Sequence, residues 1–517
     1  MIPKNIAIKA TEILGKVPKS LKTEIKNLKS RTNRVPLVIN GEFIYKNETE
    51  CHSPYDFSSQ VCVYSKASGV DVAKAIDSSR RGKEIWNKFS LNKKLDIFEK
   101  ATDLVEGKYY NKLLASTMIS QGKNYYQAEI DAICELGDFW RFNCHYRRLM
   151  ENSQVAIPQT DTYNNVIRWV PLDGIIGAIT PFNFTAIGGN LATAPLFTGN
   201  STIWKPSDYS ILSNYTVYEI LLEAGVPPEA IQFIPSDPNN FLESLVNEND
   251  LAAIAFTGSD GVFENILKDT YSNIYKYNSF PRIIGETGGY NYHVVLPDVK
   301  SEKEKLNIVE KTILGAFEYS GQKCSATSKI IVPEDDYEFY IFELQKRMKK
   351  LKVSSPEEDD CFMSAVISRE SYLKALDFVT KNEDRILVGG KFDNTNGNYI
   401  WPTLLEDNDH YLEKNYGEIF APILSISKYS PDKVEEVIDH INCSRYALTT
   451  AVFTRDEKYF NRFEETCGNL YFNDKSTGSI VGQQIFGGFR KSGTNDKAGS
   501  EYFLQRLANI QTIKYTY

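Results

Sequence analysis

The sequence predicts an α/β fold in which a parallel sheet forms one of several domains. Between residues 174 and 285, short apolar runs of strand length alternate with stretches of helix length. Such alternation is typical of parallel sheets with right-handed crossovers. The length of 517 residues exceeds a single hydrophobic core, so we expect two or three domains.

The expected elements follow one another in a regular order. Residues 35–65 are typical of short strands and turns, and helices are predicted at 72–88, 93–109 and 126–150. The strand-length runs then lie at 174–180, 201–205, 231–235, 251–256 and 282–285. The helix-length stretches between them lie at 188–197, 210–224, 241–246 and 261–271.

Composition excludes several classes of function. A net charge of −8 and a pI near 5.5 argue against nucleic acid as the main partner, because phosphate binding needs a basic surface. The eight Cys form no CxxC pair and only five His are present, so we expect a reducing compartment and no metal site. No apolar run approaches the ~20 residues of a membrane-spanning helix, and no span is predicted.

Residues 1–34 form a basic N-terminal lead-in. They are rich in Lys and Arg, and Glu12 and Glu24 are their only acidic residues. Mitochondrial targeting segments are basic, but they favour Arg and Ser over Lys. A solvated surface helix and a targeting segment therefore both remain open for this stretch.

One cysteine lies in a setting suited to a nucleophile. Leu306, Val309, Ile313 and Phe317 recur at helical spacing upstream, and residues 329–332 are predicted to form a strand. Cys324 therefore falls in a tight turn, where the adjacent Lys323 would favour the reactive thiolate. The alternative is that Cys324 packs as a small apolar side chain, and local context leaves both open.

Polar residues follow four of the predicted strands, at the points where those strands end. Ligands bind at the carboxyl ends of parallel strands, and these four turns would meet there. Taken alone, each of these segments is more simply interpreted as an ordinary turn without a binding role. Neither G-x-G-x-x-G nor a P-loop is present, although a helix opened by Gly258-Ser259 could hold a pyrophosphate at its N-terminus. The four turns read Thr180-Pro-Phe-Asn183, Lys205-Pro-Ser-Asp208, Phe256-Thr-Gly-Ser259 and Glu286-Thr-Gly-Gly289.

These turns, taken with two later motifs, resemble the aldehyde dehydrogenase superfamily in their order and rough spacing. The resemblance extends from about residue 35 through nearly the whole chain. Long stretches further resemble the L-glutamate γ-semialdehyde (Δ1-pyrroline-5-carboxylate) dehydrogenase branch, which completes proline breakdown to glutamate. The later motifs are Gly321-Gln-Lys-Cys324 and Glu418-Ile-Phe-Ala-Pro, and the branch-like stretches begin at Pro181, Ala316 and Asn473.

The resemblance implies a catalytic set of Cys324, Glu286 and Asn183. Cys324 would attack the aldehyde carbon, and the Asn183 amide with the Cys324 N–H would hold the oxyanion. Glu286 would activate the water that hydrolyses the thioester, which requires a pKa near neutrality. The alternative for Glu286 is a solvated carboxylate at a strand end.

The cofactor implied by the resemblance is NAD. An acidic residue beside the ribose hydroxyls opposes a 2′-phosphate, although Asp is shorter than Glu and some use of NADP stays open. The implied contacts are Lys205 and Asp208 with the adenosine ribose, Ser259 with the pyrophosphate, and Glu418 and Phe420 with the nicotinamide half.

The same resemblance implies how the substrate is held. Ser325, Gly478 and Ser479 would donate to its backbone carboxylate, which would discriminate against aldehydes without one. Phe184 would line the aliphatic part and Glu135 would face the site. Their alternatives are ordinary core packing for Phe184 and an exposed helix face for Glu135.

The implied architecture has a Rossmann-type cofactor domain, an α/β catalytic domain and a small β flap for oligomerisation. We expect a homodimer or a higher homo-oligomer, and, by resemblance, the mitochondrial matrix or otherwise the cytoplasm. Two other interpretations stay open: an aldehyde dehydrogenase for another substrate, and a non-catalytic protein that kept the fold. The expected boundaries are 35–153 and 173–287 for NAD binding, 288–494 for catalysis, and 154–172 and 495–517 for the flap.

Overall fold

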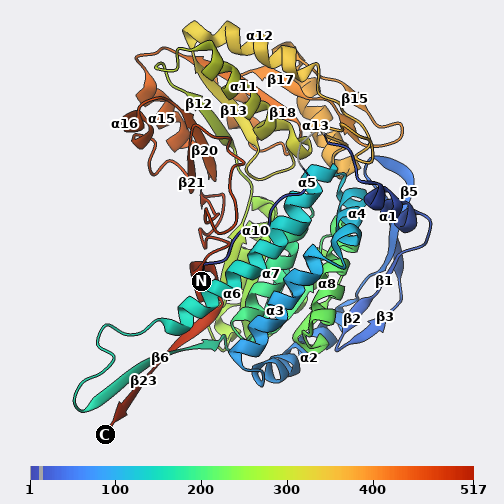
Figure 1. Cartoon of the computed structure of the whole chain (residues 1–517), viewed down its shortest axis with the longest axis vertical. Helices are drawn as coiled ribbons and strands as arrows, with labels where there is room; N and C mark the ends of the chain where they lie inside the picture. The colour runs from blue at the N-terminus through green and yellow to red at the C-terminus, as the bar shows by residue number, and fades with distance from the viewer. Residues whose placement is uncertain (1, 11–14) are drawn as a thin grey trace.

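The computed structural model describes residues 2–10 and 15–517, which form two α/β bodies and a projecting arm (Figure 1). The first body is built on a seven-stranded sheet of order β11-β10-β7-β8-β9-β2-β3. The strands from β11 to β9 are parallel, as predicted, and β2 and β3 join antiparallel at the edge. Their bounds are β7 Ile175–Ile179, β8 Thr202–Lys205, β9 Ile231–Phe233, β10 Leu251–Thr257, β11 Arg282–Glu286, β2 Leu37–Ile39 and β3 Glu42–Ile44.

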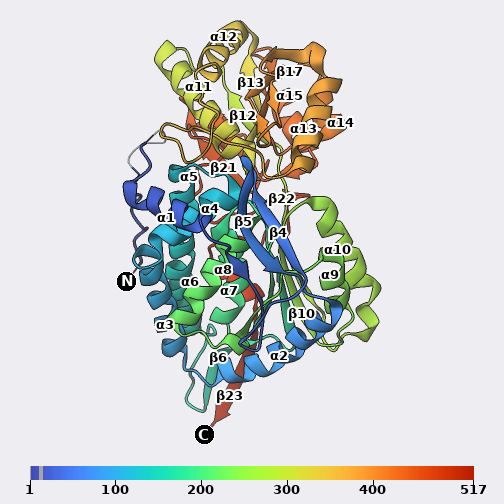
Figure 2. The same ribbon diagram turned by 90° about the vertical axis from the view of Figure 1, so that its right-hand side faces the viewer.

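Helices cover both faces of this sheet. Adjacent strand residues point to opposite faces, so Ile176 packs in one core cluster and Ile175 in the other. Figure 2 shows α9 and α10 on one side and α3, α6, α7 and α8 on the other. The four predicted crossover helices are therefore confirmed, as α7 Thr185–Phe197, α8 Ile211–Ala224, α9 Pro238–Val246 and α10 Asp260–Ser272.

The N-terminal third differs from the prediction in two places. The helix α4 was not predicted, because residues from Leu113 to Gln121 are buried all round and show no amphipathic period. The predicted helix 126–150 is interrupted by a π-helical turn at Ile130–Glu135. The elements are β1 Arg34–Val35, β4 Glu48–Ser53, β5 Asp56–Ser65, α2 Gly69–Asn87, α3 Leu91–Glu106, α4 Tyr110–Gln121, α5 Tyr125–Glu129 and α6 Leu136–Asn152.

The basic lead-in contributes a helix, α1 Lys19–Lys29, that packs on α4. Leu21, Ile25 and Leu28 are buried at helical spacing, while the lysines face outward. Lys22 and Lys29 pair with Asp359 and Glu357 of the second body. Residues 15–29 are therefore part of the folded body.

The second body holds another seven-stranded sheet, of order β14-β17-β18-β13-β12-β20-β21. It is parallel from β17 to β21. The strands are β12 Asn291–Val295, β13 Thr327–Pro333, β14 Ile386–Val388, β17 Thr403–Glu406, β18 Ile423–Tyr429, β20 Thr449–Phe453 and β21 Asn469–Phe472. The helices are α11 Glu302–Phe317, α12 Tyr337–Met348, α13 Arg369–Lys381, α14 Tyr411–Tyr416, α15 Val434–Cys443 and α16 Glu457–Asn461, with α17 Glu501–Arg506 returning to the first body.

The arm consists of two antiparallel strands, β6 Tyr163–Pro171 and β23 Ala508–Thr516 (Figure 1). The predicted pairing of these two distant segments is confirmed. Ile510 is 58% exposed on the arm, so an apolar side chain there faces solvent in the single chain. Among the described helices, none is both long and apolar enough to cross a membrane.

Candidate active site

The four polar turns singled out in the sequence lie along one edge of the first sheet. Strands β11, β10, β7 and β8 are consecutive neighbours and all run parallel. Their carboxyl ends therefore place Glu286, Thr257, Thr180 and Lys205 side by side, facing the second body.

The candidate nucleophile lies in a strained turn between α11 and β13. Tyr319, Ser320 and Gly321 have φ values of 53°, 56° and 68°, three successive residues in the left-handed region. A side chain at Gly321 would come within 2.3 Å of the Ala421 carbonyl oxygen, so glycine is required. The turn delivers Cys324 to the interface between the two bodies.

The backbone around Cys324 is held by a residue that the motif analysis missed. The Asn291 Nδ2 donates to the carbonyl oxygens of Cys324 and Ala326, both at 2.8 Å. Its Oδ1 accepts from the Thr449 N–H at 3.1 Å. Asn291 lies two residues after the Gly-Gly pair, and only its buried position marks it as part of the site.

A cavity of about 120 Å³ joins the predicted residues from both bodies. Gly478 does not line it, because its N–H donates to the Lys475 carbonyl within a turn. Asn183 lies beside it, with its Nδ2 donating to the Gln322 carbonyl at 3.2 Å. The lining includes Cys324, Glu286, Glu135, Phe184, Ser325, Thr477, Ser479, Gln484 and Phe486.

The expected effect of Lys323 on the nucleophile is wrong for this structure. The Lys323 ammonium pairs with the buried Glu318 carboxylate at 2.9 Å, a carboxylate that Lys475 also contacts at 3.3 Å. Burial raises the pKa of the Cys324 thiol well above its usual range, and the carboxylates of Glu286 and Glu418 raise it further. The free site therefore holds Cys324 as the neutral thiol at neutral pH.

Glu286 is suited to accept a proton near neutral pH. Burial raises the pKa of its carboxyl to about 7, and the nearby Asp496 adds to the increase. Within the described chain, its Oε1 has no hydrogen-bond partner. The side chain therefore keeps an acceptor free, aimed at the cavity that also holds Cys324.

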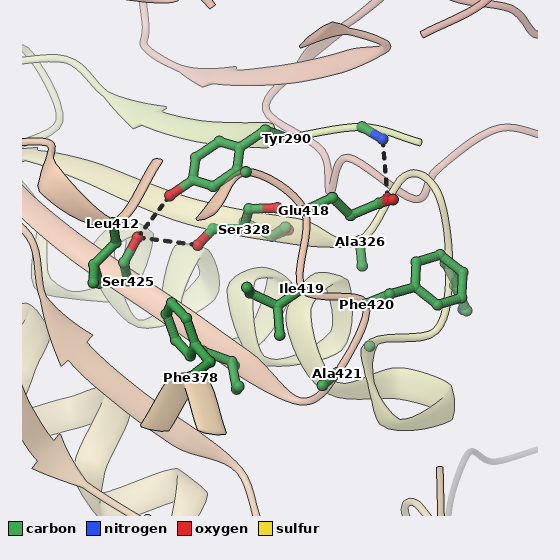
Figure 3. Close-up of a pocket in the computed structure, with 16 residues that line it drawn as sticks. Tyr290, Ala326, Ser328, Phe378, Leu412, Glu418, Ile419, Phe420, Ala421 and Ser425 are labelled. Atoms are coloured by element: carbon green, nitrogen blue, oxygen red, sulfur yellow. Dashed lines mark hydrogen bonds between the residues drawn. The ribbon is translucent and has the colours of Figure 1, made fainter. Parts of the chain in front are cut away.

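The loop that carries Glu418 and Phe420 lines a separate pocket of the second body, together with Tyr290 and Ala326 (Figure 3). The Gly289 N–H donates to Glu418 Oε1 at 3.0 Å, and burial raises the pKa of this carboxyl to about 7. A side chain at Gly288 would meet Glu418 Oε2 at 2.2 Å, which explains the glycine. Phe420 stacks edge to face with Phe182, their ring centroids 6.0 Å apart.

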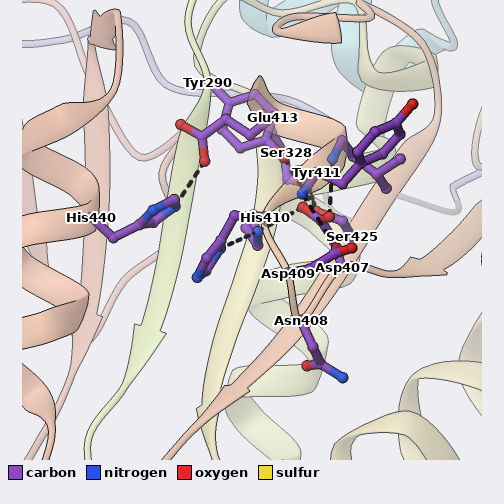
Figure 4. Close-up of polar contacts among 12 residues, drawn as sticks. Tyr290, Ser328, Asp407, Asn408, Asp409, His410, Tyr411, Glu413, Ser425 and His440 are labelled. Carbon is purple, nitrogen blue, oxygen red and sulfur yellow. Dashed lines mark hydrogen bonds and ion pairs between the residues drawn. The ribbon is translucent and has the colours of Figure 1, made fainter. Parts of the chain in front are cut away.

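A buried polar cluster anchors the short helix α14 from which this loop emerges (Figure 4). The Glu413 carboxylate accepts from His440 Nε2 at 2.9 Å and from the Tyr292 hydroxyl. At the start of the helix, Asp407 accepts from the Leu412 N–H at 3.0 Å and pairs with Lys329. A helix this short depends on such contacts for its position.

Tyr290 also belongs to the packing behind this loop. The buried Tyr290 hydroxyl lies 3.3 Å from the Ser425 Oγ (Figure 3). Ser425 in turn donates to the Ser328 carbonyl at 3.1 Å. Tyr290 is therefore held inside the second body.

At the opposite end of the sheet edge, the residues fit a dinucleotide. Asp208 pairs through Oδ2 with Lys66 at 3.3 Å, while its buried Oδ1 has no partner among residues 2–10 and 15–517. The buried Lys205 Nζ donates to the Pro206 carbonyl at 3.2 Å. Ser259 caps α10, whose free N–H groups suit a pyrophosphate. Lys66 was missed because it follows a strand of the N-terminal segment, far away in sequence.

The loop at 473–479 is fixed by the neutral His293. Burial lowers the pKa of His293 to about 3, so its Nε2 can accept from the Ser476 N–H at 3.1 Å. Ser476 Oγ then donates to the Ser325 carbonyl at 2.8 Å, which joins this loop to the nucleophile turn. Thr477 Oγ1 is buried without a partner in the described structure and lines the cavity.

Comparison with known proteins places this geometry in a family. The profile of the aldehyde dehydrogenase family matches residues 44–513. The mitochondrial delta-1-pyrroline-5-carboxylate dehydrogenase of Homo sapiens is 38% identical over 509 residues, covering 96% of this chain and 89% of the human protein. A probable delta-1-pyrroline-5-carboxylate dehydrogenase of Schizosaccharomyces pombe is 40% identical over 497 residues, covering 93% and 90%.

Solved structures agree with this placement. The delta-pyrroline-5-carboxylate dehydrogenase from Mycobacterium tuberculosis bound with NAD has a TM-score of 0.93 and 34% identity, covering 100% of this chain and 96% of that one. The 1-pyrroline-5-carboxylate dehydrogenase from Thermus with bound NAD has a TM-score of 0.92 and 27% identity, with 99% of both chains covered. The predicted fold class is confirmed, and this chain belongs to the aldehyde dehydrogenase family.

Proposed function

We propose that this protein oxidises L-glutamate γ-semialdehyde to L-glutamate with NAD, the second step of proline catabolism. The semialdehyde arises when the cyclic imine Δ1-pyrroline-5-carboxylate opens by hydrolysis. One observation carries the proposal: a single cavity is lined by a cysteine, a carboxyl with a pKa of about 7 and three hydroxyl-bearing residues, Ser325, Thr477 and Ser479. The names of the relatives above support the same reaction.

In the proposed mechanism Cys324 attacks the aldehyde carbon after losing its proton. Because burial holds the thiol neutral, a base must take that proton, and the free acceptor of Glu286 faces the same cavity. One amide hydrogen of Asn183 already binds the Gln322 carbonyl, so the other is available for the oxyanion with the Cys324 N–H.

NAD, when bound, supplies the hydride acceptor. We assign Lys205 and Asp208 to the adenosine ribose, Ser259 to the pyrophosphate, and Glu418 and Phe420 to the nicotinamide half. The unpartnered Asp208 Oδ1 supports the first assignment, because a ribose hydroxyl would complete it and a 2′-phosphate would be repelled.

Hydrolysis of the resulting thioester is assigned to Glu286. Its carboxylate would take a proton from water as that water attacks the acyl carbon. Its pKa of about 7 leaves a useful fraction ionised at neutral pH, so one residue can accept and release protons in each cycle.

We assign the substrate carboxylate to the hydroxyls of Ser325 and Ser479, and not to the N–H of Gly478, which donates to the Lys475 carbonyl. The Thr477 hydroxyl, in the same predicted loop, is a further donor, and its lack of a partner within the described residues supports it. Phe184 would contact the aliphatic chain and Glu135, with a pKa raised by burial to about 8, would face the substrate.

Substrate preference tests the proposal. The purified protein is expected to reduce NAD with L-glutamate γ-semialdehyde about 10³-fold more efficiently, in kcat/KM, than with propanal, because unpaired carboxylate donors penalise the smaller aldehyde. Succinic semialdehyde, with its carboxylate in another position, should fall between them. Equal turnover of propanal would retain the oxidation chemistry and refute the carboxylate anchor.

A variant separates the anchor from the chemistry. Ser479→Ala should lower kcat/KM for the semialdehyde about 10-fold to 100-fold, the effect of one hydrogen bond to a charged group, and leave propanal unchanged. Ser272→Ala, at an exposed helix end, is the matched control. An equal loss with both aldehydes would contradict the assignment of Ser479.

The arm supports a proposed homodimer or higher homo-oligomer. An exposed two-stranded arm bearing Ile510 offers an open edge and apolar surface to a second copy. Light scattering should give a mass near twice the 58.7 kDa of one chain, or a larger multiple. A mass of one chain in dilute solution would refute the proposal.

The proposed domain limits assign one function to each part of the chain. Residues 35–153 and 173–287 would bind NAD, 288–494 would carry the nucleophile, and 154–172 with 495–517 would form the flap. The mitochondrial matrix is the proposed compartment, because the relatives from human, zebrafish and mouse are named mitochondrial.

A further inference from the structure

A buried ammonium group lies beside the candidate site and takes no part in the mechanism above. The side chain of Lys123 is 1% exposed, and its Nζ lies 2.7 Å from Asp131 Oδ2, which is itself fully buried. The ammonium also lies over the faces of two aromatic rings. The Nζ is 3.9 Å from the ring centroid of Phe184 and 4.6 Å from that of Tyr319.

These two rings belong to the two segments that must meet at an aldehyde. Phe184 follows Asn183, the assigned oxyanion donor, and immediately precedes α7. Tyr319 is the first residue of the left-handed turn that leads to Cys324. Lys123 lies on neither segment, because it follows α4 and Gly122, so it can hold them relative to each other.

The partner of Lys123 is fastened to the same helix. The Asp131 carboxylate accepts from the N–H groups of Thr185 and Ala186 at 3.0 and 2.8 Å, and so caps the start of α7. One carboxylate thus fixes both the ammonium and the backbone next to Phe184. On the other side, the buried Tyr319 hydroxyl has no hydrogen-bond partner among the described residues, so its contact with Lys123 is through the ring face.

In this arrangement the charge of Lys123 matters, and not only the volume of its side chain. Apolar side chains in place of both Lys123 and Asp131 would fill the space without the cost of burying charge, and such replacements of buried ion pairs are often neutral for stability. An ammonium between two ring faces, in contrast, prefers a defined distance and orientation to each ring. The Tyr319 backbone is also in an unfavourable region, which persists only where neighbours hold it.

We propose that Lys123 is a positioning residue that keeps Cys324 and the Asn183 amide in register, through the rings of Tyr319 and Phe184. The proposal rests on the roles given to Cys324 and Asn183 in the proposed function. It does not depend on which aldehyde is the substrate.

The test uses two reactions of Cys324 that differ in their need for that register. p-Nitrophenyl acetate acylates the sulfur through a tetrahedral oxyanion: the S–C bond forms, nitrophenolate leaves and the thiol proton passes to base. Iodoacetamide alkylates the same sulfur by displacement of iodide and forms no oxyanion. Both can be measured on the full chain without NAD or aldehyde.

For Lys123→Met we expect acylation to slow about 10-fold to 100-fold, the cost of a small misplacement of reacting groups, while alkylation changes less than about 3-fold. Lys123→Arg, which keeps the cation, should recover part of the acylation rate. Lys112→Met is the matched control, because Lys112 also has a carboxylate partner and a nearby ring but lies at the surface. Equal slowing of both reactions, or of neither, would overturn the proposal.

Variants of Tyr319 test the same proposal if Lys123→Met fails to fold. Tyr319→Leu should reproduce the selective loss of acylation, and Tyr319→Phe should behave as wild type because the lost hydroxyl has no partner in the described chain. If Tyr319→Leu acylates normally, Lys123 is only structural. If the wild type is acylated but does not oxidise the semialdehyde, the proposed substrate fails and the positioning test remains valid.

Discussion

Replacing Cys324 by alanine is expected to lower NAD reduction with L-glutamate γ-semialdehyde by at least about 10⁴-fold, the scale seen when a catalytic nucleophile is removed. Among the described residues no other cysteine lines the cavity, and those at 51, 62, 134, 144, 361 and 467 are buried elsewhere. Binding of substrate should persist, because the assigned carboxylate donors remain. Steady-state NADH formation is the measurement.

Cys443→Ala is the matched control for this loss. Cys443 is exposed at the end of α15, so its removal should leave turnover unchanged. In the wild type, alkylation of Cys324 without substrate should be slow at neutral pH and accelerate as pH rises, because burial raises the pKa of the thiol. Full activity of Cys324→Ala would refute the nucleophile assignment.

Glu286→Gln is expected to lower steady-state turnover about 10²-fold to 10⁴-fold, the usual contribution of a general base. Because Glu286 is assigned both the Cys324 proton and the hydrolytic water, the burst of NADH in the first turnover should slow together with the steady state, and any acyl enzyme that forms should persist on Cys324. Rapid mixing would record this burst, and the mass of the trapped protein would show the added acyl group. Glu370→Gln, at an exposed helix start, is the control.

The pH profile gives an independent check on Glu286. Its folded-state pKa of about 7 means that the carboxyl is protonated, and unable to accept a proton, below that pH. Wild-type hydrolysis should therefore rise as pH increases through about 7 and level off above it. In Glu286→Gln this rise should disappear; if it persists, another group is the base.

Much of the fold could be predicted because local patterns of apolar residues and turns indicate its elements. The strands between 174 and 285 are buried on both faces, so they appear as continuous apolar runs bounded by turns. The helix α4 was missed because a fully buried helix has no polar face to reveal its period. The π-turn before Glu135 was missed because one inserted residue leaves the helical pattern intact.

The residues of the candidate site likewise fall into two groups, those that a motif identified and those that no motif marked. The motifs around Cys324, Glu286 and Glu418 could be identified because each occupies a turn whose shape needs particular residues, such as Gly288 beside the Glu418 carboxylate. The supporting residues Asn291, Lys66 and His293 carry no motif. They are recognisable only by the atoms that they contact.

By itself the sequence determined the parallel sheet, the placement of the polar turns at its carboxyl edge and the chemical types of the reacting groups. Only the tertiary structure decided their ionisation. Lys323 is adjacent to Cys324 in sequence, but its ammonium pairs with Glu318, and burial among distant segments keeps the thiol protonated and brings Glu286 to a pKa of about 7. The physical reason is that proton affinity depends on solvent exclusion and on charges within a few ångströms, which are set by packing between residues far apart in the chain.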